Sequence, residues 1–232
     1  MSGARLSLWF AGALALALLL FMPLQLVLPW LSLPPALSAT AIEGNLWHGR
    51  LRQAQWRGTA LGDLRLGLSP LPLLAGRKRL WLQAPDAALA LHLGRMRGVG
   101  DASGVLPLPA PAGLALRASL DDARLLFDDE GCREAGGRVR VEFVLPGDVL
   151  PPLILAGTPV CEGREGRLAL ASEQTAGPLL VEIAAGIDGE GGYRLQTLAR
   201  SDDPALRAVL LAAGFQEAPG GFSRVDTGRI AD

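Results

Sequence analysis

The chain has 232 residues, with 22 basic and 23 acidic side chains and a net charge of −1 at pH 7. This balance provides no basic field that would attract nucleic acid, and no nucleic-acid-binding motif is present, so we exclude a nucleic-acid function. Half of the residues are hydrophobic, and the length is enough for one domain with a substantial core or two small ones.

The first segment, residues 6–28, contains no charged residue, and its clearly polar side chains are Ser7 and Gln25. A helix needs about 20 mostly apolar residues to cross the hydrocarbon of a membrane, so the segment predicts a transmembrane anchor. Arg5 precedes it and the next basic residue is Arg50, which places residues 1–5 in the cytoplasm and the rest of the chain on the far side.

A proline and a possible cleavage site bear on how this segment is interpreted. Pro23 lies late in the apolar run, where we expect it to kink the helix. The small residues 39–41 would suit cleavage of a signal peptide, but the apolar run is longer than such peptides usually have. We favour the uncleaved anchor, and both interpretations export residues 42–232.

Residues 29–40 form a neck with prolines at positions 29, 34 and 35, which neither a helix nor a central strand would accommodate. From residue 41 onward, apolar and polar residues alternate, as is typical of strands with one buried face. Glycine-containing turn signals separate these runs, and the spacing leaves no room for crossover helices. Residues 41–232 therefore predict an antiparallel, mostly β domain. The alternating runs are residues 64–68, 89–93, 139–143, 167–170 and 181–183.

Some glycine and proline positions are predicted to interrupt the strands. Gly98 with Gly100, and Gly136 with Gly137, predict turns. Proline-rich residues 107–112 predict a loop that could divide the domain in two, and residues 145–152 predict a second loop.

The chain predicts one helix in the exported part, over residues 205–213. Asp203 suits its N-cap, Pro204 its first position and Gly214 the position after its last turn. Its apolar residues recur at helical spacing, and we expect this stripe to pack on the sheet. A last strand is predicted to run to Ile230.

The two cysteines are Cys132 and Cys161, both in the exported part. In an oxidising compartment, such a pair is more often a disulfide than two free thiols, and we predict the disulfide. The chain offers His48 and His92 as imidazole ligands, and neither lies at the spacing of a zinc site, so no metal site is predicted.

No arrangement of residues typical of catalysis or of cofactor binding is found, and we predict that the protein is not an enzyme. We interpret His48, beside Trp47, as a packed or hydrogen-bonded residue and His92 as a solvent-facing one. The acidic residues 121–122 and 128–130 are interpreted as solvated turns. The basic residues 77–79 are interpreted as a hairpin tip, with contact to anionic lipid as the alternative.

One motif is more specific than these patterns. Directly after the neck, the sequence Ile-Glu-Gly-Asn-Leu-Trp-His-Gly-Arg predicts a strand entering a tight turn, with glycines at the bend and a tryptophan anchoring the first strand. Together with the N-terminal anchor, the β-rich domain, the cysteine pair and the closing helix, this motif resembles the type II secretion system protein N family. The motif positions in this chain are Gly44, Trp47, Gly49 and Arg50.

The resemblance implies an accessory, non-catalytic inner-membrane subunit of the machine that exports folded periplasmic proteins across the outer membrane. It also implies a bacterial inner-membrane protein with one span, its C-terminal domain in the periplasm and other secretion subunits as partners. An alternative from the leucine, valine and isoleucine stripes is a membrane-anchored lipid-handling protein with a half-open β groove, for which phospholipid would be the partner. An exported hydrolase with an unrecognised site is the third and least favoured hypothesis.

Overall fold

A computed structural model describes residues 3–27, 37–109, 115–144, 152–174 and 178–229 of the chain. Most of the predicted neck, the tip of the loop at 107–112 and most of the loop at 145–152 lie outside these residues. The helices are α1 (Gly3–Leu20), α2 (Leu24–Val27), α3 (Pro70–Leu74) and α4 (Pro204–Ala212).

The rest of the described chain is almost entirely β, which confirms the predicted mostly β, antiparallel fold. Each alternating run of the sequence lies within a strand. The strands are β1 (Leu37–Ser38), β2 (Ala41–Gly44), β3 (Gly49–Trp56), β4 (Thr59–Leu68), β5 (Lys78–Gln83), β6 (Ala87–Leu93), β7 (Arg97–Leu108), β8 (Ala115–Phe127), β9 (Cys132–Val144), β10 (Leu153–Gly157), β11 (Pro159–Glu162), β12 (Glu165–Ser172), β13 (Leu180–Ile187), β14 (Gly192–Arg200), β15 (Gln216–Ala218) and β16 (Gly221–Arg229).

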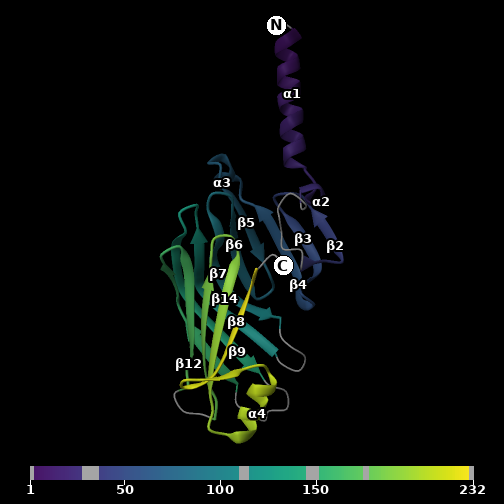
Figure 1. Ribbon diagram of the computed structural model, residues 1–232. Coiled ribbons are helices and arrows are strands. Elements are labelled where there is room, and N and C mark those ends of the chain that lie inside the picture. The colour runs from purple at the N-terminus through teal and green to yellow at the C-terminus, as the bar shows by residue number, and fades with distance from the viewer. Residues whose placement is uncertain (1–2, 28–36, 110–114, 145–151, 175–177, 230–232) are drawn as a thin grey trace.

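All of these strands belong to one long antiparallel sheet (Figure 1). Its order is β1-β3-β4-β5-β6-β7-β8-β9-β10-β12-β13-β14-β16-β15, so neighbours in the chain are almost everywhere neighbours in the sheet. Strand β2 pairs with β3, and β11 pairs with β12. Strands β7 and β8 pair from Arg97 with Phe127 to Leu108 with Leu116, so the sheet continues through the predicted break near 107–112.

Two apolar clusters lie along this sheet rather than one central core. The first is formed by Leu24 of α2 together with buried residues of the N-terminal strands, among them Leu51 and Leu66. The second is formed by residues of β9 to β14 and is centred on Leu155, which has no exposed surface. The two clusters are the buried faces of the period-two pattern in the two halves of the chain.

The predicted turns at Gly98–Gly100 and at Gly136–Gly137 are wrong. The first pair lies inside β7 and the second inside β9, where the register between strands shifts. Asp121 and Asp122, predicted as part of a turn, also lie within a strand, β8, at the shift opposite Gly137. The shift is a β-bulge, in which Asp122 and Ala123 of β8 face the single residue Gly137 of β9. Asp122 has φ +49° and Gly137 has φ +81°, a conformation that glycine accepts readily.

Helix α1 projects from one end of the sheet, and α4 lies at the opposite end (Figure 1). None of the helices in the described part of the chain is long and apolar enough to cross a membrane. The predicted kink at Pro23 is instead an end: α1 stops at Leu20, and Pro23 forms a β-bridge with Asn45.

Helix α4 is confirmed with the predicted caps. The Asp203 side chain accepts a hydrogen bond of 2.8 Å from the backbone N–H of Ala205, Pro204 is the first residue, and Gly214 has φ +84°. None of its residues is buried. The expected packing of its stripe on the sheet is limited to Leu210, which contacts the second cluster.

Candidate functional site

The motif after the neck folds as a tight turn between β2 and β3. The side-chain oxygen Oδ1 of Asn45 accepts hydrogen bonds from the backbone N–H groups of Trp47 (3.1 Å) and His48 (2.8 Å). Gly44 has φ +90°, and a Cβ atom on it would overlap the backbone oxygen of His48. Glycine is therefore required at this position by both conformation and space.

This turn holds the segment that follows α1. The backbone N–H of Leu46 donates to the oxygen of Met22 (3.0 Å), and the side-chain amide of Gln25 donates to the oxygen of Ile42 (2.9 Å). Between these bonds, the side chain of Leu24 has no exposed surface. It occupies the space above Gly49, where a Cβ atom would overlap it. The turn thus attaches the end of the N-terminal helix to the sheet.

Trp47 and His48 follow in the same turn. Trp47 is half-buried against the first apolar cluster, and its backbone oxygen occupies the space where a Cβ atom on Gly67 would lie. The His48 ring packs edge-on against Trp81, with 6.1 Å between the ring centroids. His48 therefore has the packing role expected of it, on an exposed surface.

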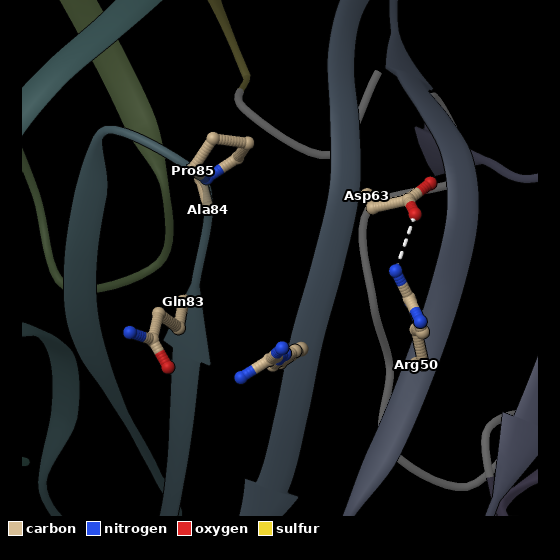
Figure 2. Close-up of a pocket in the computed structure, with 6 residues that line it drawn as sticks. Arg50, Asp63, Gln83, Ala84 and Pro85 are labelled. Atoms are coloured by element: carbon tan, nitrogen blue, oxygen red, sulfur yellow. Dashed lines mark hydrogen bonds and ion pairs between the residues drawn. The ribbon is translucent and has the colours of Figure 1, made fainter.

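Arg50, the last motif residue, faces a polar pocket on the surface of the sheet (Figure 2). Its guanidinium pairs with Asp63 at 2.7 Å. The other Asp63 oxygen accepts a hydrogen bond of 3.1 Å from the backbone N–H of Gln53. The Gln53 N–H and then Arg50 hold the pKa of Asp63 below its usual value, against the opposing effect of desolvation.

The pocket has a volume of about 320 Å³ and extends over β3, β4 and β5. The strand register places Arg65 opposite Arg50 on one side and opposite Gln83 on the other. Asp63 neutralises one of the two arginines, so the pocket carries one excess positive charge and can hold a carboxylate on its surface. It contains no nucleophile or general base beyond the ion-paired Asp63.

The predicted disulfide is formed. Cys132, at the start of β9, is bonded to Cys161 in β11, with 5.5 Å between their Cα atoms. The backbone N–H of Cys132 also donates to the oxygen of Arg164 (3.2 Å), so the β11–β12 hairpin is held against the β8–β9 turn. The bond is far from the motif in sequence.

His92 does not face solvent as expected. It is half-buried, and its Nε2 atom lies over Gly100 of β7. Burial, and then the positive charge of Arg79, lower the pKa of His92. The remaining acidic residues are spread along the surface, and the described residues contain no group of three or more potential metal ligands.

A second hollow, larger than the polar pocket, lies over the second cluster, and we call it the C-terminal groove. It has a volume of about 610 Å³ and is lined by β7 to β10, β12 to β14, β16 and the residues around α4. Most lining side chains are aliphatic, and the polar ones are Gln174, Thr197, Arg224 and Asp226. The alternating pattern predicted apolar strand faces, but not that eight strands would contribute side chains to one hollow.

Sequence reasoning missed Leu24, Asp63 and Arg65 as parts of the N-terminal site. Leu24 was assigned to the membrane segment, since its neighbours are equally apolar. Asp63 and Arg65 lie in a stretch where apolar and polar residues alternate, and this pattern predicts a strand but no site. Their approach to Arg50 depends on the register between β3 and β4.

Comparison with known proteins supports the resemblance seen in the sequence. Comparisons with curated proteins and with solved structures gave no match. The model of the family described as type II secretion system (T2SS), protein N, matches residues 35–224, which include the motif turn, the polar pocket, the disulfide and most of the C-terminal groove. The chain therefore belongs to the type II secretion system protein N family.

Proposed function

We propose that this protein is an accessory, non-catalytic inner-membrane subunit of the type II secretion system. The family match over residues 35–224 is the observation that carries the proposal. In this role helix α1, the projecting part of the apolar run 6–28, anchors the chain, the N-terminus is cytoplasmic and the β domain lies in the periplasm. The partners are the inner membrane and other secretion subunits.

The motif turn fits such a role. A subunit that transmits position from the membrane to a periplasmic assembly needs its anchor fixed to its domain, and a free linker would not provide this. The two backbone-directed hydrogen bonds from Leu46 and Gln25, and the burial of Leu24, fix the end of α1 to the first strands. Gly49 is the position at which this close approach requires glycine, and Gly44 is the one that the turn itself requires.

Co-purification tests the proposal. The full chain, tagged at its C-terminus and expressed in its own host, is extracted from membranes in a mild detergent, and bound proteins are identified by mass spectrometry. We expect other type II secretion subunits to be enriched over the same tag on an unrelated single-span protein. Recovery of none of them would refute the assignment to the secretion machine.

Topology is tested separately. Alkaline phosphatase fused to the C-terminus folds to an active enzyme only where its disulfides form. We expect activity in intact cells and none when residues 1–28 are deleted. A fusion that is inactive with the segment present would contradict the periplasmic placement.

A second candidate function is lipid handling at the same membrane. The C-terminal groove favours it, because a large hollow with aliphatic walls is a feature that a purely scaffolding domain does not need. Transfer of fluorescent phospholipid between donor and acceptor vesicles tests this function. The control is an equal amount of heat-unfolded bovine serum albumin. A transfer rate no higher than that of this control would count against lipid handling.

A further inference from the structure

We propose that the C-terminal groove is a binding site for one acyl chain of a phospholipid. The groove is distinct from the motif turn and the polar pocket, and its occupancy does not depend on membership in a secretion assembly. The inference rests on the volume of the groove, the chemistry of its walls and the hydrogen bonding of its floor.

The walls are aliphatic along the length of the groove. Leu116, Phe143 and Leu153 stand opposite one another on β8, β9 and β10. Leu170 and Ile183 continue the same face on β12 and β13. All five line the groove, and Leu210 with Phe215, at the end of α4, closes it on one side. Its volume of about 610 Å³ falls within the range of sites that enclose a small ligand.

Apart from Gln174, the polar lining side chains lie at one end, on β14 and β16. Along the row that begins with Leu170 and Ile183, the next two residues are Thr197 on β14 and Arg224 on β16. Arg224 is already paired there: its guanidinium contacts Asp226 at 2.9 Å and donates to the oxygen of Ala213, also at 2.9 Å. The groove therefore has an apolar interior and one polar, electrically balanced rim.

The floor of the groove discriminates against a peptide. Strands β9, β10, β12, β13 and β14 have a partner strand on each side over most of the lining residues, so most of their backbone N–H and C=O groups are already hydrogen-bonded. Strand β16 is paired with β14 alone at Arg224 and Asp226. A peptide lying in the groove would bury backbone polar groups without partners, at a cost of several kcal/mol per group at most. An alkyl chain has no such groups along its length.

The rim favours a phospholipid over a free fatty acid. Among the described residues lining the groove, Arg224 is the cation, and Asp226 neutralises it. A fatty-acid carboxylate would have to compete with Asp226 for the same guanidinium. A phospholipid carries its phosphate on a head group that stays in water beyond the rim, so only its chain enters the groove.

Photo-crosslinking of the full chain tests the proposal. The protein is extracted with its native lipids in a styrene–maleic acid polymer and equilibrated with phosphatidylethanolamine that carries a diazirine in one acyl chain. After irradiation, the labelled peptides are mapped by mass spectrometry. We expect adducts within residues 153–226, in addition to those that surrounding lipid gives in residues 6–28.

Matched variants locate the signal. Thr197→Trp fills the groove, whereas Gln196→Trp places the same side chain on the exposed face of the same strand. We expect Thr197→Trp to lower the 153–226 adducts at least fivefold and Gln196→Trp to leave them within twofold. If Thr197→Trp fails to fold, as judged by thermal unfolding, Ile183→Trp with Ala184→Trp as its control replaces the pair.

Three outcomes would overturn the inference. These are an absence of adducts in residues 153–226, adducts that Thr197→Trp leaves unchanged, and adducts that form with a diazirine fatty acid but not with the phospholipid. Adducts in the groove without secretion partners in the co-purification would support this site while refuting the proposed function. Secretion partners in the co-purification without adducts in the groove would support the proposed function and refute this site.

Discussion

Replacing Leu24 by alanine tests most directly whether the segment after α1 is fixed to the sheet. We call this contact between the segment and the first strands the joint. The Leu24 side chain has no exposed surface, although it belongs to a segment whose sequence alone favours the membrane. Replacing a fully buried leucine by alanine costs about 3 to 5 kcal/mol, from lost transfer free energy and the cavity left behind. A small domain has a total stability of roughly 5 to 15 kcal/mol, so the expected loss is a large part of it.

Leu26 provides the matched control. It lies two residues away in the same short helix α2, but 62% of its surface is exposed. We expect Leu26→Ala to change the free energy of unfolding by about 0.5 kcal/mol or less. The measurement is equilibrium unfolding in urea, followed by tryptophan fluorescence, because Trp47 packs on the cluster that contains Leu24.

A double-mutant cycle with Gly49 makes the test specific. A Cβ atom on Gly49 would overlap Leu24, so Gly49→Ala alone should destabilise by about 1 to 3 kcal/mol. In the Leu24→Ala background the overlap is gone, and the two effects should fall short of additivity by at least about 1 kcal/mol. Equal effects of Leu24→Ala and Leu26→Ala, or strict additivity with Gly49→Ala, would refute this account of the joint.

Three further predictions concern the rest of the domain. Cys132→Ser with Cys161→Ser should lower the free energy of unfolding by about 3 kcal/mol, as estimated for a loop of this length, and dithiothreitol should shift the urea midpoint of the parent but not of the variant. His92 has a pKa below 6.5 in the folded protein, so its contribution to stability is present above pH 6.5 and is lost as the pH falls through the lower folded value. His92→Gln should therefore reduce the fall in unfolding free energy between pH 7 and pH 5, and an unchanged pH profile would argue against it. Gly137→Ala should lower the free energy of unfolding more than Gly58→Ala does. Both glycines have φ +81°, but only at Gly137 does a backbone oxygen, that of Asp122, lie where the Cβ atom would be. Equal unfolding free energies of the two variants would contradict the role of the bulge.

The wrong turn predictions at Gly98–Gly100 and Gly136–Gly137 have one cause, which is the conformational freedom of glycine. A glycine with positive φ serves a tight turn and a β-bulge equally well, so the local signal is the same for both. Gly58 lies in a turn between β3 and β4, while Gly137 lies inside the 13-residue strand β9. What separates the two is the partner strand, and the identity of that partner is not a local property.

In the candidate sites, too, some features follow from the local sequence and others only from the folded sheet. The glycines of the motif predict the tight turn. Only the structure shows that the Asn45 side chain holds the turn by accepting hydrogen bonds from the backbone N–H groups two and three residues ahead. That this turn holds Leu24 could not be predicted, since burial depends on what the folded sheet leaves open. The approach of Arg65 to Arg50 likewise follows from the strand register.

The sequence by itself determined the antiparallel β class, the capped helix α4, the cysteine pair and the resemblance to the secretion family. Each of these depends on a period, a cap or a spacing that a short stretch of chain contains. The tertiary structure alone decided that the strands form one continuous sheet, that the apolar run is divided between a projecting helix and the buried Leu24, and that the C-terminal half curves around a groove. Those features depend on strand register and curvature, which arise from contacts between residues far apart in the chain.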